Sequence, residues 1–136
     1  MRVRCLSSFL KDDQRAAIGL PQGESIRYAI TPGSEYVVLG LSVKPQGSRN
    51  GSGLFVEIAN DWGQCRGISI SLFEVIDARC SKYWHVRSHE NGTVLLWPEE
   101  FYEEYFLDDL IEGDARARQI FADLVSRMDT EVQEEP

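Results

Sequence analysis

The sequence lacks the segments that would place the protein in a membrane or on a secretory route. No stretch approaches the roughly 18 consecutive apolar residues of a membrane-spanning helix. The first residues, MRVRCLSSFLKDD, lack the apolar run of about 7–15 residues that a secretory signal needs. Cysteine is scarce, because Cys5, Cys65 and Cys80 form neither an even-numbered framework nor a CxxC pair. Few, unpaired cysteines indicate reduced thiols, so we expect a cytoplasmic protein that does not contact a membrane.

Motifs for catalysis, metal binding and nucleotide binding are also missing. Neither GxGxxG nor GxxxxGK occurs, so no phosphate-binding loop is predicted. His85 and His89 have a helical zinc spacing, but on the strand predicted for this segment their rings would lie about 13 Å apart. A nucleophilic Cys80–His85 pair would need a third group to orient the ring, and the sequence shows none. Cys65 belongs to no zinc knuckle, so we predict no cofactor, no metal and no catalytic residue.

The composition is that of one globular domain. The chain has 136 residues, of which 43% are hydrophobic and 26% are charged. A chain of this size buries enough apolar surface for one core without disulfides. We expect a single domain over residues 1–128, followed by a flexible acidic tail over residues 129–136.

Alternating apolar residues predict a series of short strands. The alternation is clearest over 26–30, 35–43, 54–59 and 66–76, and its phase flips near Leu72, which indicates a bulge or a strand end. Within 35–43, Gly40 marks a bulge or a close approach of the backbone. Asn91-Gly92 predicts a hairpin between strands at 83–89 and 93–97. Together with residues 2–9, these segments predict an antiparallel, barrel-like or strongly twisted sheet of six to seven strands.

At Pro98 the apolar period changes from two to about 3.6 residues, which predicts helices. Proline is favoured in the first turn of a helix, and Gly113 is a suitable stop. A second helix is expected from Asp114 to Met128, with one apolar stripe that includes Phe121 and Leu124. The predicted fold class is therefore α+β, with two C-terminal helices packed on the sheet.

Charge is distributed unevenly along the chain. The formal net charge is −8, of which residues 1–90 contribute +2 and residues 91–136 contribute −10. Phosphate binding scales with the number of cations, so nucleic acid is an unfavourable partner. An acidic end favours a basic protein partner. A solvated helical surface that keeps the protein soluble is the other interpretation.

The acidic segment is also rich in aromatic residues. In WPEEFYEEYFLDDLIE, residues 97–112, the apolar arc of a helix would be too wide to bury completely against the sheet. Exposed aromatic rings with a charged rim are typical of contact surfaces. The alternative is that every aromatic ring is core and every acid is solvated. The predicted protein-binding residues are Glu100, Tyr102, Glu103, Glu104, Asp108 and Asp109.

The run LFEVIDARCSKYWHVR at 72–87, followed by WPEEF and FLDDLIEGD, resembles short uncharacterised bacterial proteins, some of them like immunity proteins of toxin systems. The resemblance covers about residues 36–125 and matches no functional motif, so it carries over no site residue. It implies a non-enzymatic protein that binds and blocks a toxin. A negative surface would suit a basic nuclease toxin, whose phosphate-binding cleft it would occupy.

Two other functions remain open from the sequence. One is a small enzyme or ligand-binding barrel with a pocket near Tyr83, Trp84 and His85. The other is a homo-oligomer assembled through the aromatic helix. A dimer that is lost on Tyr102→Ala would favour the second.

Overall fold

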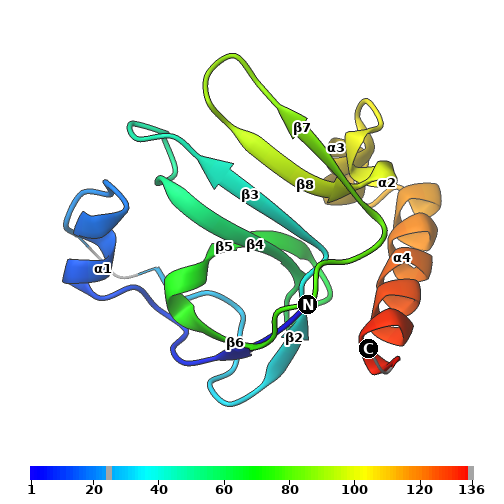
Figure 1. Ribbon diagram of the computed structural model, residues 1–136, viewed down its shortest axis with the longest axis horizontal. Coiled ribbons are helices and arrows are strands. Elements are labelled where there is room, and N and C mark those ends of the chain that lie inside the picture. The colour runs from blue at the N-terminus through cyan, green and yellow to red at the C-terminus, as the bar shows by residue number, and fades with distance from the viewer. Residues whose placement is uncertain (24–25, 135–136) are drawn as a thin grey trace.

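Two antiparallel sheets form the body of the protein, and the C-terminal helices pack along one side of them (Figure 1). The computed structural model describes residues 1–23 and 26–134. Among the helices of these residues, none has both the length and the apolar character needed to cross a bilayer. The elements in chain order are β1 (Arg2–Cys5), α1 (Asp12–Ala17), β2 (Glu35–Val37), β3 (Gly40–Lys44), β4 (Gly53–Ala59), β5 (Cys65–Ser69), η1 (Ile70–Leu72), β6 (Phe73–Asp77), β7 (Trp84–Ser88), β8 (Val94–Pro98), α2 (Glu99–Tyr102), α3 (Phe106–Glu112) and α4 (Ala115–Gln133).

The predicted α+β class is confirmed, but the sheet differs from the prediction. A three-stranded sheet has the order β2-β1-β6, and a five-stranded sheet has the order β5-β4-β3-β8-β7. The strands of the described residues do not close into one barrel. The predicted strand 35–43 divides between the two sheets, because the Val38 amide donates to Met1 and the Leu39 amide donates to Glu57. The first half therefore pairs with β1 and the second half with β4.

Three further strand predictions have different outcomes. Residues 26–30 form no strand and make one isolated bridge, between Arg27 and Phe9, while the Asp61 amide donates to the Ala29 oxygen. The predicted phase flip near Leu72 is confirmed, because the 3-10 turn η1 ends β5 there and β6 continues in the other sheet. The Asn91-Gly92 hairpin is also confirmed, with β7 and β8 in antiparallel register.

The core consists of two apolar clusters. The first includes Val3, Val38, Ile58 and Leu72, and it gathers side chains from both sheets. The second joins Leu39 to the buried faces of the C-terminal helices, with Phe101, Phe106, Phe121, Leu124 and Met128 as its main members. Leu39 lies where the chain passes from β2 to β3, so the helices pack at the junction of the two sheets.

The C-terminal helices differ from the prediction in number and length. Residues 103–105 divide the first predicted helix into α2 and α3, whereas Gly113, at φ 83°, ends α3 as expected. Asp114 caps α4 by accepting a hydrogen bond of 2.9 Å from the Ala117 amide. The helix continues to Gln133 with Val132 buried, so residues 129–133 of the predicted tail belong to α4. Residues 135–136 of that tail lie outside the described residues.

Candidate functional site

The break between α2 and α3 brings a tyrosine to the surface. Phe101 and Phe106 are both buried, and their rings stack with centroids 6.2 Å apart. Burying both rings requires the chain between them to turn outward. Tyr105 makes this turn at φ 66°, the only positive φ of a non-glycine residue in the described part of the chain. A left-handed backbone is uncommon for a residue with a bulky side chain, and here it leaves the tyrosine 66% exposed.

Carboxylates surround this tyrosine. We use the name acidic ridge for the exposed residues of the α2–α3 turn and α3. They enclose a shallow hollow of about 440 Å³, lined by Tyr105, Ile111 and three of the acids. None of the acids of the ridge forms an ion pair with another described residue. The acidic ridge consists of Glu103, Glu104, Tyr105, Asp108, Asp109, Ile111 and Glu112.

Four of the six predicted binding residues lie on the ridge, namely Glu103, Glu104, Asp108 and Asp109. The other two are engaged within the chain. The Glu100 carboxylate pairs with Arg127 of α4 at 2.6 Å.

Tyr102 has a structural role between α2 and the β7–β8 hairpin. Its hydroxyl donates to the main-chain oxygen of His85 at 2.6 Å and lies 3.1 Å from that of Leu95. The Arg87 guanidinium lies 4.1 Å from the centre of the Tyr102 ring. The loss of a dimer on Tyr102→Ala would therefore not identify an interface, since the substitution also removes these contacts.

The other residues considered from the sequence are dispersed. No group of three or more His, Cys, Asp and Glu side chains that could hold a metal ion occurs within residues 1–23 and 26–134. His85 is exposed on β7, and Cys80 is exposed in the segment before that strand. The Trp84 indole donates to the Leu39 oxygen at 2.9 Å, and Arg127 covers the Tyr83 ring. Tyr83, Trp84 and His85 line neither the hollow of the ridge nor the larger cleft behind it.

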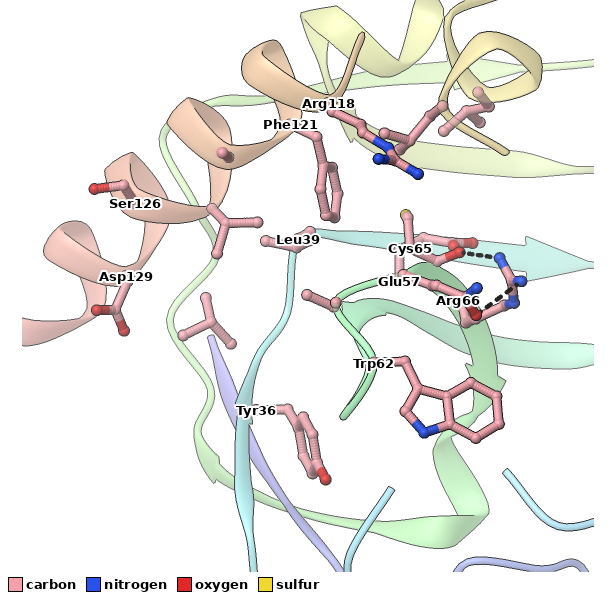
Figure 2. Close-up of a pocket in the computed structure, with 18 of the residues that line it drawn as sticks. Tyr36, Leu39, Glu57, Trp62, Cys65, Arg66, Arg118, Phe121, Ser126 and Asp129 are labelled. Carbon is pink, nitrogen blue, oxygen red and sulfur yellow. Dashed lines mark hydrogen bonds between the residues drawn. The ribbon is translucent and has the colours of Figure 1, made fainter. Parts of the chain in front are cut away.

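That larger cleft separates the C-terminal helices from the sheets. It has a volume of about 970 Å³ and runs between α3 and α4 on one side and β2, β4 and β5 on the other (Figure 2). Its walls are mainly apolar and include Leu39, Leu110 and Phe121. Trp62, in the turn between β4 and β5, stands at its rim and is 77% exposed. Ile111 lines both the cleft and the hollow of the ridge, so the two cavities share a border.

A carboxylate and a thiol also line the cleft. Glu57 on β4 lies opposite Gly67 of β5 and Gly40 of β3, so no side chain stands directly beside it on either strand. Ser42 donates a hydrogen bond of 3.1 Å to Glu57 and accepts one of 3.1 Å from the Trp97 indole. Burial raises the pKa of the Glu57 carboxyl above its ordinary value, and the Ser42 hydrogen bond opposes this. Burial also raises the pKa of the Cys65 thiol, which makes this cysteine a poor nucleophile.

Comparisons of the chain with protein-family models, with curated proteins and with solved structures gave no match. The function is therefore inferred from the geometry of the ridge and the cleft.

Glu57→Gln should stabilise the protein at neutral pH. Because the folded-state pKa of Glu57 lies above the ordinary value of 4.5, the folded protein holds this proton more tightly than the unfolded chain. Ionisation of Glu57 therefore costs stability as the pH rises through 4.5 and beyond. Glutamine removes this cost and keeps an oxygen for Ser42. Urea unfolding should give a higher free energy for the variant at neutral pH and equal values below pH 4.5.

Glu90→Gln is the matched control, because Glu90 is exposed, lies outside the ridge and the cleft, and forms no ion pair with another described residue. Its free energy of unfolding should follow that of the wild type throughout this pH range. A Glu57→Gln protein that is less stable than the wild type at neutral pH would show that the ionised carboxylate contributes to folding.

The sequence identified the ridge but not the cleft. The ridge comes from one continuous segment, and its charge is visible in the sequence. The cleft combines β2, β4, β5, α3 and α4, and Arg118 on α4 lies far along the chain from Glu57 and Arg66 on the β4–β5 hairpin. A signal that could have indicated it is Gly67, because a glycine inside a predicted strand can mark the close approach of another group. The added Cβ of an alanine at Gly67 would lie 2.8 Å from a Glu57 oxygen.

Proposed function

We propose that the protein is a non-enzymatic binding module whose acidic ridge docks a basic protein partner. The observation that carries this proposal is an exposed tyrosine and an exposed isoleucine surrounded by five carboxylates without ion-pair partners among the described residues. Ile111 is 71% exposed, and Tyr105 is nearly as accessible. An apolar centre with a polar rim is the usual anatomy of a protein interface.

The stability of the helix explains only some of the carboxylates of the acidic ridge. Asp108 and Asp109 lie in the first turn of α3, where the positive end of the helix dipole favours acids. Glu112 lies at the opposite end of α3, where the dipole disfavours an acid. Glu103 and Glu104 precede α3 and repel the same carboxylates. A partner with lysines or arginines facing the ridge would relieve this repulsion and associate faster through the attraction of opposite charges.

A homo-oligomer through the ridge is less favourable. In a two-fold contact the same patch meets itself. Five carboxylates of one copy would then face five of the other, without any cation of the ridge to neutralise them. Like charges across an interface oppose association. The charge of the ridge therefore favours a partner of opposite sign.

The test uses a pair of aspartates and a closely matched control pair. Asp108→Asn with Asp109→Asn changes the first turn of α3, whereas Asp12→Asn with Asp13→Asn makes the same change in the first turn of α1. The two helices lie at opposite ends of the molecule (Figure 1). A partner captured from the native cell at low salt should bind the ridge variant about tenfold more weakly, a loss of about 1.4 kcal/mol. The control variant should bind like the wild type.

The proposal fails if both aspartate variants bind the partner equally well, or if added salt leaves the affinity unchanged. Toxin neutralisation is its most specific form, and it rests on the resemblance of the sequence to immunity proteins. In that case production of the partner alone should arrest growth, and production of the wild-type chain should restore it. The ridge variant should restore growth less well than the Asp12→Asn, Asp13→Asn control.

A further inference from the structure

The charged residues that line the cleft are two arginines, Arg66 and Arg118, and three acids, Glu35, Glu57 and Asp129. Figure 2 shows the guanidinium groups of Arg66 and Arg118 at one end, while Asp129 of α4 lies toward the other. Arg66 belongs to β5 and Arg118 to α4, so the fold places two cations from distant parts of the chain along the wall of one cleft. The apolar side chains of Leu39 and Phe121 lie between these ends.

Neither arginine is neutralised within the described residues. Arg66 donates to two uncharged acceptors, the Cys65 main-chain oxygen at 2.9 Å and the Gln64 side-chain oxygen at 3.1 Å. Arg118 forms no ion pair in residues 1–23 and 26–134, although the whole chain has 22 acids against 14 bases. Its guanidinium is held over Gly113, since a Cβ built on that glycine would lie 2.9 Å from the Arg118 Nη2 atom. Two guanidinium groups therefore remain available to an anion.

The volume and the lining of the cleft suit a small molecule. Ligand pockets measure roughly 300–1,000 Å³, and their walls are mostly apolar with a few polar groups that orient the ligand. The cleft, at about 970 Å³, is at the upper end of this range. An apolar chain would cover Leu39 and Phe121. Arginine binds carboxylates through two parallel hydrogen bonds, which fixes the orientation of the anionic head.

From this geometry we infer that the cleft binds a small amphipathic monocarboxylate, with its apolar chain between α4 and the sheet and its carboxylate at Arg66 and Arg118. A phosphate ester carries a charge of about −1.5 to −2, and Glu57 in the same cleft makes a second negative charge less favourable. This inference is independent of the acidic ridge, because none of the acids of the ridge lines the cleft.

Decanoate is a suitable probe, used with the full chain at concentrations below those at which it forms micelles. Calorimetric titration should show one decanoate bound per chain. Decyltrimethylammonium has a similar chain and the opposite charge, so it should bind about tenfold more weakly or worse. Trp62 fluorescence should change on binding, because the ligand covers the exposed rim, and Trp62→Phe should abolish most of this signal.

The decisive variant is Arg66→Gln with Arg118→Gln. It should weaken decanoate binding about tenfold or more, as expected for the loss of charge-assisted hydrogen bonds. Binding of the uncharged 1-decanol should stay nearly unchanged, which shows that the apolar walls are intact. Arg49→Gln with Arg116→Gln is the matched control, because both arginines are exposed and neither lines the cleft.

Two results would overturn the inference. One is the absence of decanoate binding to the wild type at millimolar concentration. The other is equal decanoate affinity for the wild type and the Arg66→Gln, Arg118→Gln variant. Either result would leave the proposed function untouched, because capture of a basic partner through Asp108 and Asp109 does not depend on these arginines.

Discussion

Leu124→Ala should lower the free energy of unfolding by about 2–5 kcal/mol. Leu124 is 0% exposed and lies in the apolar cluster that joins α4 to Leu39. Alanine would remove its packing and leave a cavity, because the rings of Phe101 and Phe121 around it belong to separate helices that cannot close together freely. Urea unfolding followed by far-ultraviolet circular dichroism measures the loss.

Ile111→Ala is the control for the loss of a large apolar side chain from a helix. Ile111 is 71% exposed, so its replacement should change stability by no more than about 0.5 kcal/mol. Equal costs for the two substitutions would mean that α4 does not pack against Leu39 and the sheets. Because α4 forms one wall of the cleft, Leu124→Ala should also weaken decanoate binding, although Leu124 itself does not line the cleft.

The features predicted correctly are those that neighbouring residues determine. Asn91-Gly92 forms its hairpin, Gly113 ends α3 in the left-handed conformation, and the stripe of Phe121, Leu124 and Met128 is buried. Each depends on a local preference for positive φ or on a helical period. The buried stripe continues to Val132, beyond the predicted end of the helix at Met128. The residues around Val132 are polar and do not indicate a helix there.

The features missed depend on contacts between distant segments. Val37, Leu39, Leu41 and Val43 continue one alternating pattern, so no local signal divides β2 from β3. The division is set by Met1 and Glu57, which accept the hydrogen bonds of consecutive amides. The alternation of apolar side chains predicts which face of a strand is buried, but it does not predict which strand the segment pairs with.

The kink at Tyr105 has a similar origin. No glycine or proline lies between α2 and α3, so the sequence predicts one helix there. Packing of both Phe101 and Phe106 in the core outweighs the cost of a left-handed tyrosine, which is about 1–3 kcal/mol. The same turn exposes the Tyr105 ring. The aromatic centre of the acidic ridge is therefore a consequence of the burial of Phe101 and Phe106. The sequence predicts a contact surface within residues 97–112 that includes Tyr102, whose hydroxyl is bonded within the chain, and does not include Tyr105, whose ring is exposed.

Gly40→Ala is expected to lower the free energy of unfolding by about 1–3 kcal/mol through overpacking. Gly40 was predicted to mark a bulge or a close approach, and the structure shows the latter. A Cβ at this position would lie 2.8 Å from Cδ1 of Trp97 and 3.2 Å from the Leu96 oxygen. The indole must move, which stretches its hydrogen bond to Ser42 and so disturbs the partner of Glu57. Urea unfolding measures the cost, and near-ultraviolet circular dichroism should report the displaced indole.

A double-mutant cycle assigns this cost to the indole. In a Trp97→Phe background the smaller ring leaves room for the new methyl group, so Gly40→Ala should cost clearly less than in the wild type. Gly23→Ala is the control, because a Cβ there meets nothing within 4 Å. It should change stability by no more than about 0.5 kcal/mol. If Gly40→Ala costs the same with either ring at position 97, the backbone oxygen of Leu96 and not the indole is the obstacle, and the coupling from Gly40 through Trp97 and Ser42 to the cleft does not exist.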